Sequence, residues 1–163
     1  MVLTYDQLNT SLLATITTIP GYQESLMQLM SLLYKTGIRP VESLDRNRWN
    51  VLLNGNVQLI TAKNSGIRIF DPSELPVPFY IDLLNDRWLF SDIRSSQSMY
   101  FFLKLWQYSK AKVGDKVVGL YAFRYRYVKY LVLEGYSPSE IQIKMGWSNV
   151  NLVHRYNGAQ IEF

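Results

Sequence analysis

The chemistry that this sequence offers most densely is the binding of an anion. The stretch YAFRYRYVKY, from Tyr121 to Tyr130, holds four tyrosines, one phenylalanine and three basic residues in ten positions. Arginine and lysine side chains bind phosphate and carboxylate oxygens, and phenol groups donate hydrogen bonds to the same oxygens. Three structures are compatible with this stretch: a surface that holds an anion, a helix that buries its rings, and a strand with one aromatic and one basic face.

Basic residues concentrate in the C-terminal part of the chain, although the net charge of the 163 residues is only +4. Residues 1–99 carry 8 Lys and Arg against 9 Asp and Glu, whereas residues 100–163 carry 9 against 4. Within residues 101–130 the count is 7 against 1. A polyanion is one partner that fits such a concentration, and a solvated basic face is the alternative.

Several classes of site and location are disfavoured by composition. The chain has no cysteine, which excludes disulfides, thiolate metal sites and a cysteine nucleophile. We find no histidine or carboxylate spacing typical of a metal site and therefore expect no metal and no cofactor. The N-terminus lacks the pattern of a signal peptide, and no apolar run approaches about 18 residues. We expect no membrane association and an intracellular location, in the cytoplasm or at the nucleoid.

The elements that must position the basic and aromatic residues begin with helices. Segments 3–16 and 20–37 have helical spacing of apolar residues, and Gly37 is a suitable end for the second. A further helix opens at Pro40. Turn signals at Asn54-Gly55 and at 64–66 then predict a three-stranded antiparallel meander. Its expected strands are 49–53, 57–62 and 67–70.

The second half of the chain is mainly helical in this interpretation, with helices expected at 78–88, 96–114, 121–134 and 149–158. The stretch at 121–134 is long for a strand, which favours a helix, but its period-2 alternation keeps the strand as a competitor. Ser137 and Glu140 form a capping box for another helix, which Gly146 closes. The fold class is therefore α+β, mainly helical with a small three-stranded antiparallel sheet, over a single domain of residues 1–163.

Four segments in a fixed order carry a family resemblance. They read TGIRPVESL, ITAKNSGIRIF, YAFRYRYVKYLVLEGYSPSEIQIKMGWSN and VNLVHRYNG. The first resembles the T-G-x-R-x-x-E-L box of the tyrosine recombinases, a family that includes phage integrases and Xer-type recombinases. The third is similar to their second box, H-x-L-R-H-x-x-A-x-x-L…G…I-Q-x-x-L-G-H-S. The resemblance spans about residues 20–158 and implies the catalytic domain of that family.

The resemblance implies an activity, a partner and six catalytic residues. The activity is the cleavage and rejoining of double-stranded DNA at a specific recombination site through a 3′-phosphotyrosine, without metal or ATP. Arginine forks suit the charge on a scissile phosphate, a lysine on a hairpin can protonate the 5′ leaving oxygen, and a tyrosine can attack phosphorus. The residues that correspond are Arg39, Lys63, Tyr121, Arg124, Trp147 and Tyr156, with Glu42 and His154 in support.

Each of these residues also has an ordinary structural explanation. Arg39 at three residues from Glu42 fits a helical ion pair, Trp147 fits a core ring, and Tyr156 is one of 12 tyrosines. His154, the single histidine, fits a surface or packing position. The ordered set of six is what favours a catalytic site over these separate explanations.

Two positions depart from the usual family pattern. Tyr121 stands where the family usually has histidine, although a Tyr-x-x-Arg form is known among integrases of archaeal plasmids and viruses. A phenol with a pKa near 10 is a poorer base than an imidazole near 6.5, so we expect Tyr121 to position the phosphate. Trp147 stands at a position where the family accepts His or Trp, and its indole N–H can donate to a phosphate oxygen.

The remaining expectations concern DNA contacts and assembly. The residues expected to contact DNA are Arg126, Lys129, Lys104, Lys110 and Lys112. The N-terminal domain with which relatives clasp DNA is expected to be absent. Only seven residues follow Tyr156, where many relatives have a longer segment that docks onto a neighbouring subunit. We therefore expect a monomer or weak dimer for the isolated domain, with a homo-tetramer as the assembly on DNA. Two alternatives stay open: a non-catalytic helix–turn–helix protein built on residues 136–157, and a recombinase-fold protein that has lost catalysis.

Overall fold

The computed structural model describes residues 23–43, 45–63, 66–87, 112–113, 116–117, 121–157 and 161–162. The helix expected at 3–16 and most of the one expected at 96–114 lie outside these residues. Helix α2 spans Gln23–Thr36 and α3 spans Pro40–Ser43, in agreement with the sequence prediction. Helix α2 packs against α6 (Ala122–Leu133), and this contact joins the two halves of the described chain.

The predicted meander is present, with strands β1 (Trp49–Val51), β2 (Val57–Ile60) and β3 (Ile67–Phe70) in the order β1-β2-β3. Both pairs are antiparallel, with Trp49 opposite Leu59 and Leu59 opposite Arg68. The first predicted turn is present. Gly55 adopts a φ of 89° in it, a value that glycine reaches more easily than other residues. Two of the strands are shorter than expected and end at Val51 and Ile60.

Alternate residues of the meander face a helix, while the others face solvent. Helix α4 (Val77–Leu84) packs against β1, and the Trp49 and Phe79 rings meet edge to face with centroids 4.9 Å apart. The 3-10 helices η1 (Arg46–Arg48) and η2 (Pro72–Glu74) flank the sheet. The buried face of the sheet consists of Trp49, Val57, Leu59, Arg68 and Phe70, so an arginine occupies a core position.

A second small sheet contradicts part of the sequence prediction. Strands β4 (Lys112–Val113), β5 (Lys116–Val117) and β6 (Ile161–Glu162) form an antiparallel sheet in the order β5-β4-β6. The helix predicted to continue to 114 is therefore wrong at residues 112–113. Two residues separate β4 from β5, and their Gly-Asp sequence matches a two-residue hairpin turn that the helical interpretation overlooks.

The C-terminal helices form their own core. Helix α7 (Pro138–Met145) has the predicted capping box at Ser137 and ends at Gly146 with a φ of 66°. Helix α8 (Asn151–Asn157) packs on α6 and α7. The residues buried together are Tyr127, Val128, Leu131, Ile141, Met145, Trp147 and Val153. The helical prediction for 121–134 is confirmed over the strand, because α6 spans Ala122–Leu133 and buries the sequence neighbours Tyr127 and Val128 together, which a strand would place on opposite faces.

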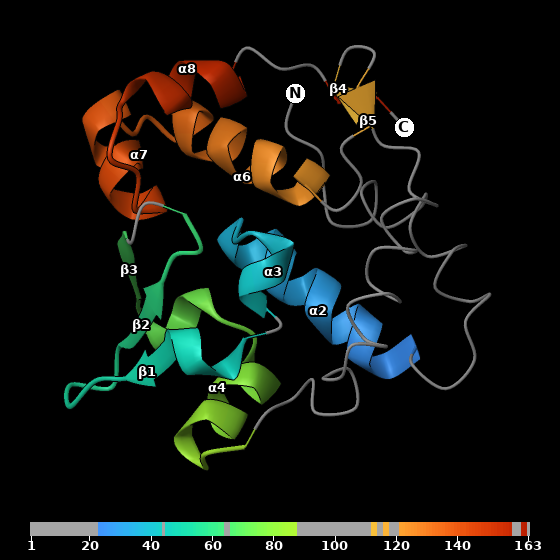
Figure 1. The fold of residues 1–163 in the computed structure, drawn as a ribbon, viewed down its shortest axis with the longest axis vertical. Coiled ribbons are helices and arrows are strands. Elements are labelled where there is room, and N and C mark those ends of the chain that lie inside the picture. The colour runs from blue at the N-terminus through green and yellow to red at the C-terminus, as the bar shows by residue number, and fades with distance from the viewer. Residues whose placement is uncertain are drawn as a thin grey trace.

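Helices α6, α7 and α8 occupy the upper part of the view in Figure 1, and the sheet β1–β3 with α4 occupies the lower part. Helices α2 and α3 lie between these two groups (Figure 1). Among the described helices, none has both the length and the apolar composition that crossing a membrane requires. Hydrogen bonds connect the segments that carry predicted site residues: Arg124 of α6 to Gly37, Arg124 to Tyr156 of α8, and Ala62 to Glu42 of α3.

Candidate active site

Arg39 and Glu42 are held together by the turn between α2 and α3. Helix α2 ends at Thr36, Gly37 adopts a φ of 61°, and Pro40 starts α3. The Arg39 backbone N–H donates to Glu42 Oε1 at 2.6 Å, and Arg39 Nη1 lies 3.4 Å from Glu42 Oε2. The carboxylate is therefore both the cap of α3 and the partner of the Arg39 guanidinium, so the predicted ion pair exists and fixes this side chain.

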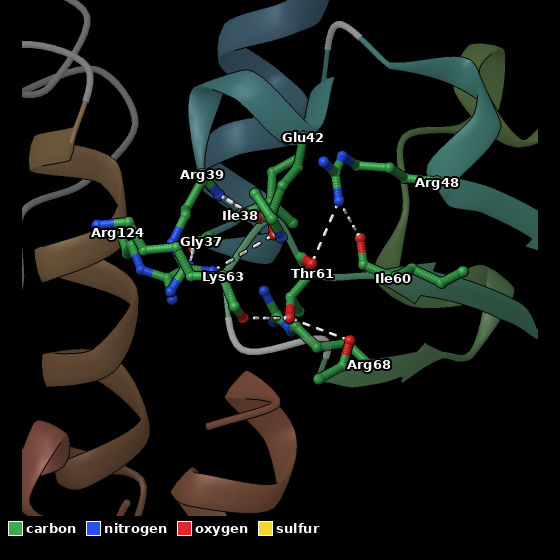
Figure 2. A network of polar contacts seen from close by, with 12 residues as sticks. Gly37, Ile38, Arg39, Glu42, Arg48, Ile60, Thr61, Lys63, Arg68 and Arg124 are labelled. Carbon is green, nitrogen blue, oxygen red and sulfur yellow. Dashed lines mark hydrogen bonds and ion pairs between the residues drawn. The ribbon is translucent and has the colours of Figure 1, made fainter. Parts of the chain in front are cut away.

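Glu42 also ties the hairpin of Lys63 to Arg39. The backbone N–H of Ala62 donates to Glu42 Oε2 at 2.8 Å, directly before Lys63. The hydroxyl of Thr61 donates to the carbonyl of Lys63 at 3.1 Å (Figure 2), while the Lys63 side chain is exposed. One buried carboxylate thus sets the distance between the first arginine and the end of β2, from which an exposed lysine extends.

Arg124 lies in the first turn of α6 and is 1% exposed. Its Nη1 donates to the carbonyl of Gly37 at 2.8 Å, and its Nε donates to the hydroxyl of Tyr156 at 3.3 Å. Its Nη2 is buried and has no hydrogen-bond partner among the described residues. Burial lowers the pKa of Arg124, whereas the nearby Tyr156 raises it. The guanidinium therefore bridges α2 and α8 and keeps one donor for another group.

Trp147 and Tyr156 form an aromatic stack beside Arg124. Their ring centroids are 5.1 Å apart at an interplanar angle of 25°, and the Tyr125 ring covers Tyr156 at 4.5 Å. Arg124 lies 5.4 Å from the centroid of the Trp147 ring. Trp147 Nε1 is buried and lacks a hydrogen-bond partner within the described part of the chain. Trp147 is thus a core ring, as its ordinary explanation requires, and also an indole with a donor to spare.

Tyr121 lies at the N-cap of α6, one turn before Arg124. Burial raises the pKa of its phenol, Arg39 and Arg124 lower it, and Tyr156 and Glu42 raise it. These four groups are those of the predicted site, so Tyr121 lies within their electrostatic reach. Because the pKa rises above its ordinary value near 10, the phenol stays protonated at neutral pH and is a hydrogen-bond donor there.

The site contains more buried positive charge than its described carboxylate balances. Arg39 and Arg124 surround a region in which Glu42 is the buried acidic residue, and two buried donors lack partners in the described residues. An unpaired buried charge or donor is costly in free energy. Arg124 Nη2 and Trp147 Nε1 therefore fit an anion with several acceptor oxygens, such as a phosphodiester.

Sequence reasoning missed Arg68, which lies on the inner face of β3 and is 2% exposed. The alternation of Ile67, Arg68, Ile69 and Phe70 places it on the same strand face as Phe70. An arginine at a position that strand periodicity assigns to the core is the signal that could have identified it. Burial lowers its pKa, and Arg124 is near enough to lower the pKa further.

The residues predicted to contact DNA differ in their exposure to solvent. Arg126 is buried rather than exposed, because it stacks over the Tyr34 ring at 3.9 Å and donates to the Tyr34 hydroxyl at 2.9 Å. It is an internal contact between α6 and α2. Lys129 is half-buried on α6, and His154 is exposed on α8. Lys112 belongs to β4, whereas Lys104 and Lys110 lie outside the described residues.

Comparison with known proteins supports the fold and little beyond it. No family model matches the chain, and no curated protein matches it in sequence. The solved structure of XerA recombinase matches with a TM-score of 0.57 and 18% identity over 96% of this chain. XerH site-specific recombinase bound to its difH substrate in a pre-cleavage complex matches with a TM-score of 0.55 and 16% identity over 95%.

The chain spans 58% of the XerA chain and 49% of the XerH chain. The described elements, mainly helices with a small antiparallel sheet, agree with these structures. The expected fold class is confirmed: the chain has the fold of a tyrosine recombinase. Within the described residues, no three His, Asp or Glu side chains gather as a metal site would require.

Proposed function

We propose that this chain, which has the tyrosine recombinase fold, cleaves and rejoins double-stranded DNA at a specific site through a 3′-phosphotyrosine. The observation that carries the proposal is the pair of buried donors, Arg124 Nη2 and Trp147 Nε1, which lack described partners beside the Tyr156 hydroxyl. A scissile phosphate offers the oxygens that these donors need.

The phosphate would be held by both arginines and by the indole. Arg124 would donate through Nη2 to one non-bridging oxygen, and Trp147 Nε1 would donate to another. Arg39, kept in place by Glu42, would add a second positive charge as negative charge grows in the transition state. Tyr121, protonated at neutral pH, would donate a hydrogen bond to the same group.

The chemical step would exchange one phosphoester for another. The Tyr156 oxygen would attack phosphorus, form the P–O bond of the phosphotyrosine and lose its proton to water, while the bond from phosphorus to the 5′ oxygen breaks. Lys63 would supply the proton that the leaving 5′ oxygen takes up. Attack of a 5′-hydroxyl on the phosphotyrosine reverses these changes. The product keeps a phosphoester of similar energy, so rejoining needs no ATP.

The Tyr156 hydroxyl accepts its hydrogen bond from Arg124 of the same chain. This contact supports delivery of the nucleophile in cis, within one subunit. Assembly of four copies on DNA, with integration or excision of a mobile element carried by a virus or plasmid, is the wider reaction that the fold would serve.

The test is a covalent trapping experiment on duplexes with a randomised centre, so that the target sequence need not be chosen in advance. Each duplex carries a nick, so cleavage releases a short fragment that diffuses away. The covalent adduct then has no 5′-hydroxyl to reverse the reaction and accumulates. We expect denaturant-resistant protein–DNA adducts that become enriched in one sequence over successive rounds. The adducts should be absent with Tyr156→Phe.

Reversible binding with no adduct in any round would contradict the proposal. That result would favour a recombinase-fold protein without catalysis, or a DNA-binding protein that reads sequence through α7 and α8. Arg46→Met, which alters an arginine that donates to Trp49 O at 2.8 Å away from the site, is the matched control and should form adducts normally.

A further inference from the structure

The side chain of Arg68 joins three elements beneath the candidate active site. It extends from β3, and its Nε donates to the carbonyl of Lys144 in α7 at 2.7 Å. Its Nη2 donates to the carbonyl of Thr36 at the end of α2, also at 2.7 Å. Both bonds are short, and the side chain is buried, so this is a fixed junction rather than a surface contact.

Both carbonyls belong to the last turns of helices, where carbonyl groups lack partners within the helix. The negative end of the helix dipole also lies there, which favours a cation. One guanidinium therefore satisfies the C-terminal ends of α2 and α7 together. A lysine ammonium presents a point charge without the fixed planar fork and is a poor substitute at such a junction.

Each of these helix ends leads directly into a segment of the site. Beyond Thr36 the chain passes through Gly37, whose carbonyl binds Arg124, to Arg39. Beyond Lys144 it passes through Gly146 to Trp147. Two short stretches thus run from the carbonyls that Arg68 holds to the side chains that would hold the phosphate. We propose that Arg68 is a positioning residue, which sets the separation between Arg39, Arg124 and Trp147 and so governs phosphate affinity.

The surrounding packing leaves little freedom for another arrangement. A Cβ on Gly66, at the start of β3, would lie 2.1 Å from the carbonyl oxygen of Gly146. A Cβ on Gly146 would lie 3.1 Å from Cγ of Arg68. The β3 backbone therefore touches the turn before Trp147, and Arg68 lies at this contact. A change in the length or hydrogen bonding of the side chain at position 68 would therefore displace the turn at Gly146.

Arg68 also contributes charge to the site. Burial lowers its pKa to about 10, so the group remains protonated at neutral pH. Its guanidinium lies over the Phe70 ring at 4.6 Å and the Tyr127 ring at 5.7 Å, which partly replace the lost water. Three of the buried arginines, Arg39, Arg68 and Arg124, lie near Glu42, which is the one buried carboxylate among the described residues. A bound phosphate would reduce this imbalance.

The experiment uses inorganic phosphate as the probe and the indole N–H signal of Trp147 in a two-dimensional NMR spectrum as the readout. Trp147→Phe assigns the signal. We expect the wild-type signal to shift as phosphate binds, and the dissociation constant to rise about tenfold or more in Arg68→Met, equivalent to at least one lost charge-assisted interaction. The dissociation constant of Arg68→Lys should lie between those of the wild type and Arg68→Met, because lysine keeps the charge but not the paired hydrogen bonds.

This inference rests on the proposed function, and the outcomes separate the two. A folded Arg68→Met variant with the wild-type phosphate affinity would show that Arg68 only stabilises the fold, and would overturn the inference alone. If that variant does not fold, Arg68→Lys decides in the same way. No response of the wild-type Trp147 signal to phosphate would overturn both. Arg46→Met is the control for loss of an arginine elsewhere and should keep the wild-type affinity.

Discussion

At the scale of single residues, Tyr121 determines which proton transfers the site can carry out. Burial raises the pKa of its phenol, so at neutral pH it holds its proton and could not accept the one that Tyr156 would lose in the proposed reaction. A phenol in this position can still orient a phosphate through its hydroxyl. The proposed enzyme would therefore work with strong phosphate binding and weak base catalysis.

Replacing Tyr121 by His should supply the missing base. An imidazole has an ordinary pKa near 6.5, and both burial and the neighbouring Arg39 and Arg124 favour its neutral form. We expect the rate of adduct formation to rise by about 10²-fold, within the usual range for general base catalysis. The rate should increase with pH through an inflection below about 6.5, as the imidazole loses its proton.

The control for that experiment is Tyr121→Phe, which removes the hydroxyl and adds no base. Its adduct rate should fall about tenfold or more, the effect of one hydrogen bond to a charged oxygen, with no new inflection. Equal rates and equal pH profiles for the His variant and the wild type would mean that residue 121 takes no part in proton transfer.

Replacing Trp147 by Phe should lower activity without lowering stability. The change keeps a ring to stack on Tyr156 and removes the buried N–H that lacks a described partner. The smaller ring leaves a cavity that lowers stability, but removal of an unsatisfied buried donor relieves about 1–3 kcal/mol, so urea unfolding should give a nearly unchanged free energy of unfolding. The adduct rate should fall about tenfold, because one donor to the phosphate is gone. A destabilised but fully active variant would contradict this role for the indole.

The sequence identified most of the residues that meet here because their order follows a family pattern. Strand periodicity marks Arg68 as a core position, but it does not show the two carbonyl groups of distant helices to which the side chain donates. Sequence reasoning also placed Arg126 on the surface, since periodicity does not show that Tyr34 of α2 covers it. Contacts between side chains and the backbone of other elements leave no mark in a single sequence.

At the scale of elements, the hairpin between β2 and β3 depends on a close backbone contact. Gly66 approaches Gly146 so closely that a methyl group would collide with its carbonyl oxygen at 2.1 Å. The contact sets the height of the hairpin, and therefore of Lys63, above the turn that carries Trp147. Strand propensity and turn signals predicted the hairpin, but they gave no indication that it touches the end of α7.

Gly66→Ala should therefore destabilise the protein by about 1–3 kcal/mol, the usual cost of overpacking. It should also slow adduct formation, because the hairpin must move and Lys63 moves with it. Urea unfolding and the trapping assay measure the two effects. Gly135→Ala is the control, since a Cβ there meets nothing within 4 Å and only its φ of 92° opposes the change. That variant should lose stability but keep its adduct rate.

Helix ends and turns were the elements that the sequence predicted best. The capping box at Ser137, the glycine ends at 37 and 146 and the turn at Asn54-Gly55 all depend on local chemistry. The second sheet was missed because β6 comes from a segment far along the chain, and β4 and β5 are only two residues long each. Such short strands carry almost no periodic signal.

At the scale of the whole molecule, the candidate site is made by the meeting of two groups of elements. Arg39 and Lys63 come from the α2, α3 and sheet side, while Arg124, Trp147 and Tyr156 come from α6 to α8. Arg124 crosses between the groups through Gly37 and holds Tyr156 as well. On the proposed function, the site would therefore be completed within one subunit.

A mixing experiment tests that arrangement. Tyr156→Phe lacks the nucleophile, and Arg124→Lys loses the planar fork, which should lower the rate by about 10²–10³-fold. If the nucleophile acts in cis, a mixture of the two variants should yield no more adduct than either alone. Recovery of adduct in the mixture would show that one subunit supplies its tyrosine to another.

The pairing of strand β6 bears on which DNA end could move during such a reaction. It pairs with β4 only a few residues after Tyr156, and α8, which carries Tyr156, packs against α6 and α7. The attacking residue is thus anchored on both sides along the chain. A DNA strand joined to Tyr156 would be fixed to the body of the protein. The end with the free 5′-hydroxyl would then have to travel between duplexes, while the protein-linked end waits in place.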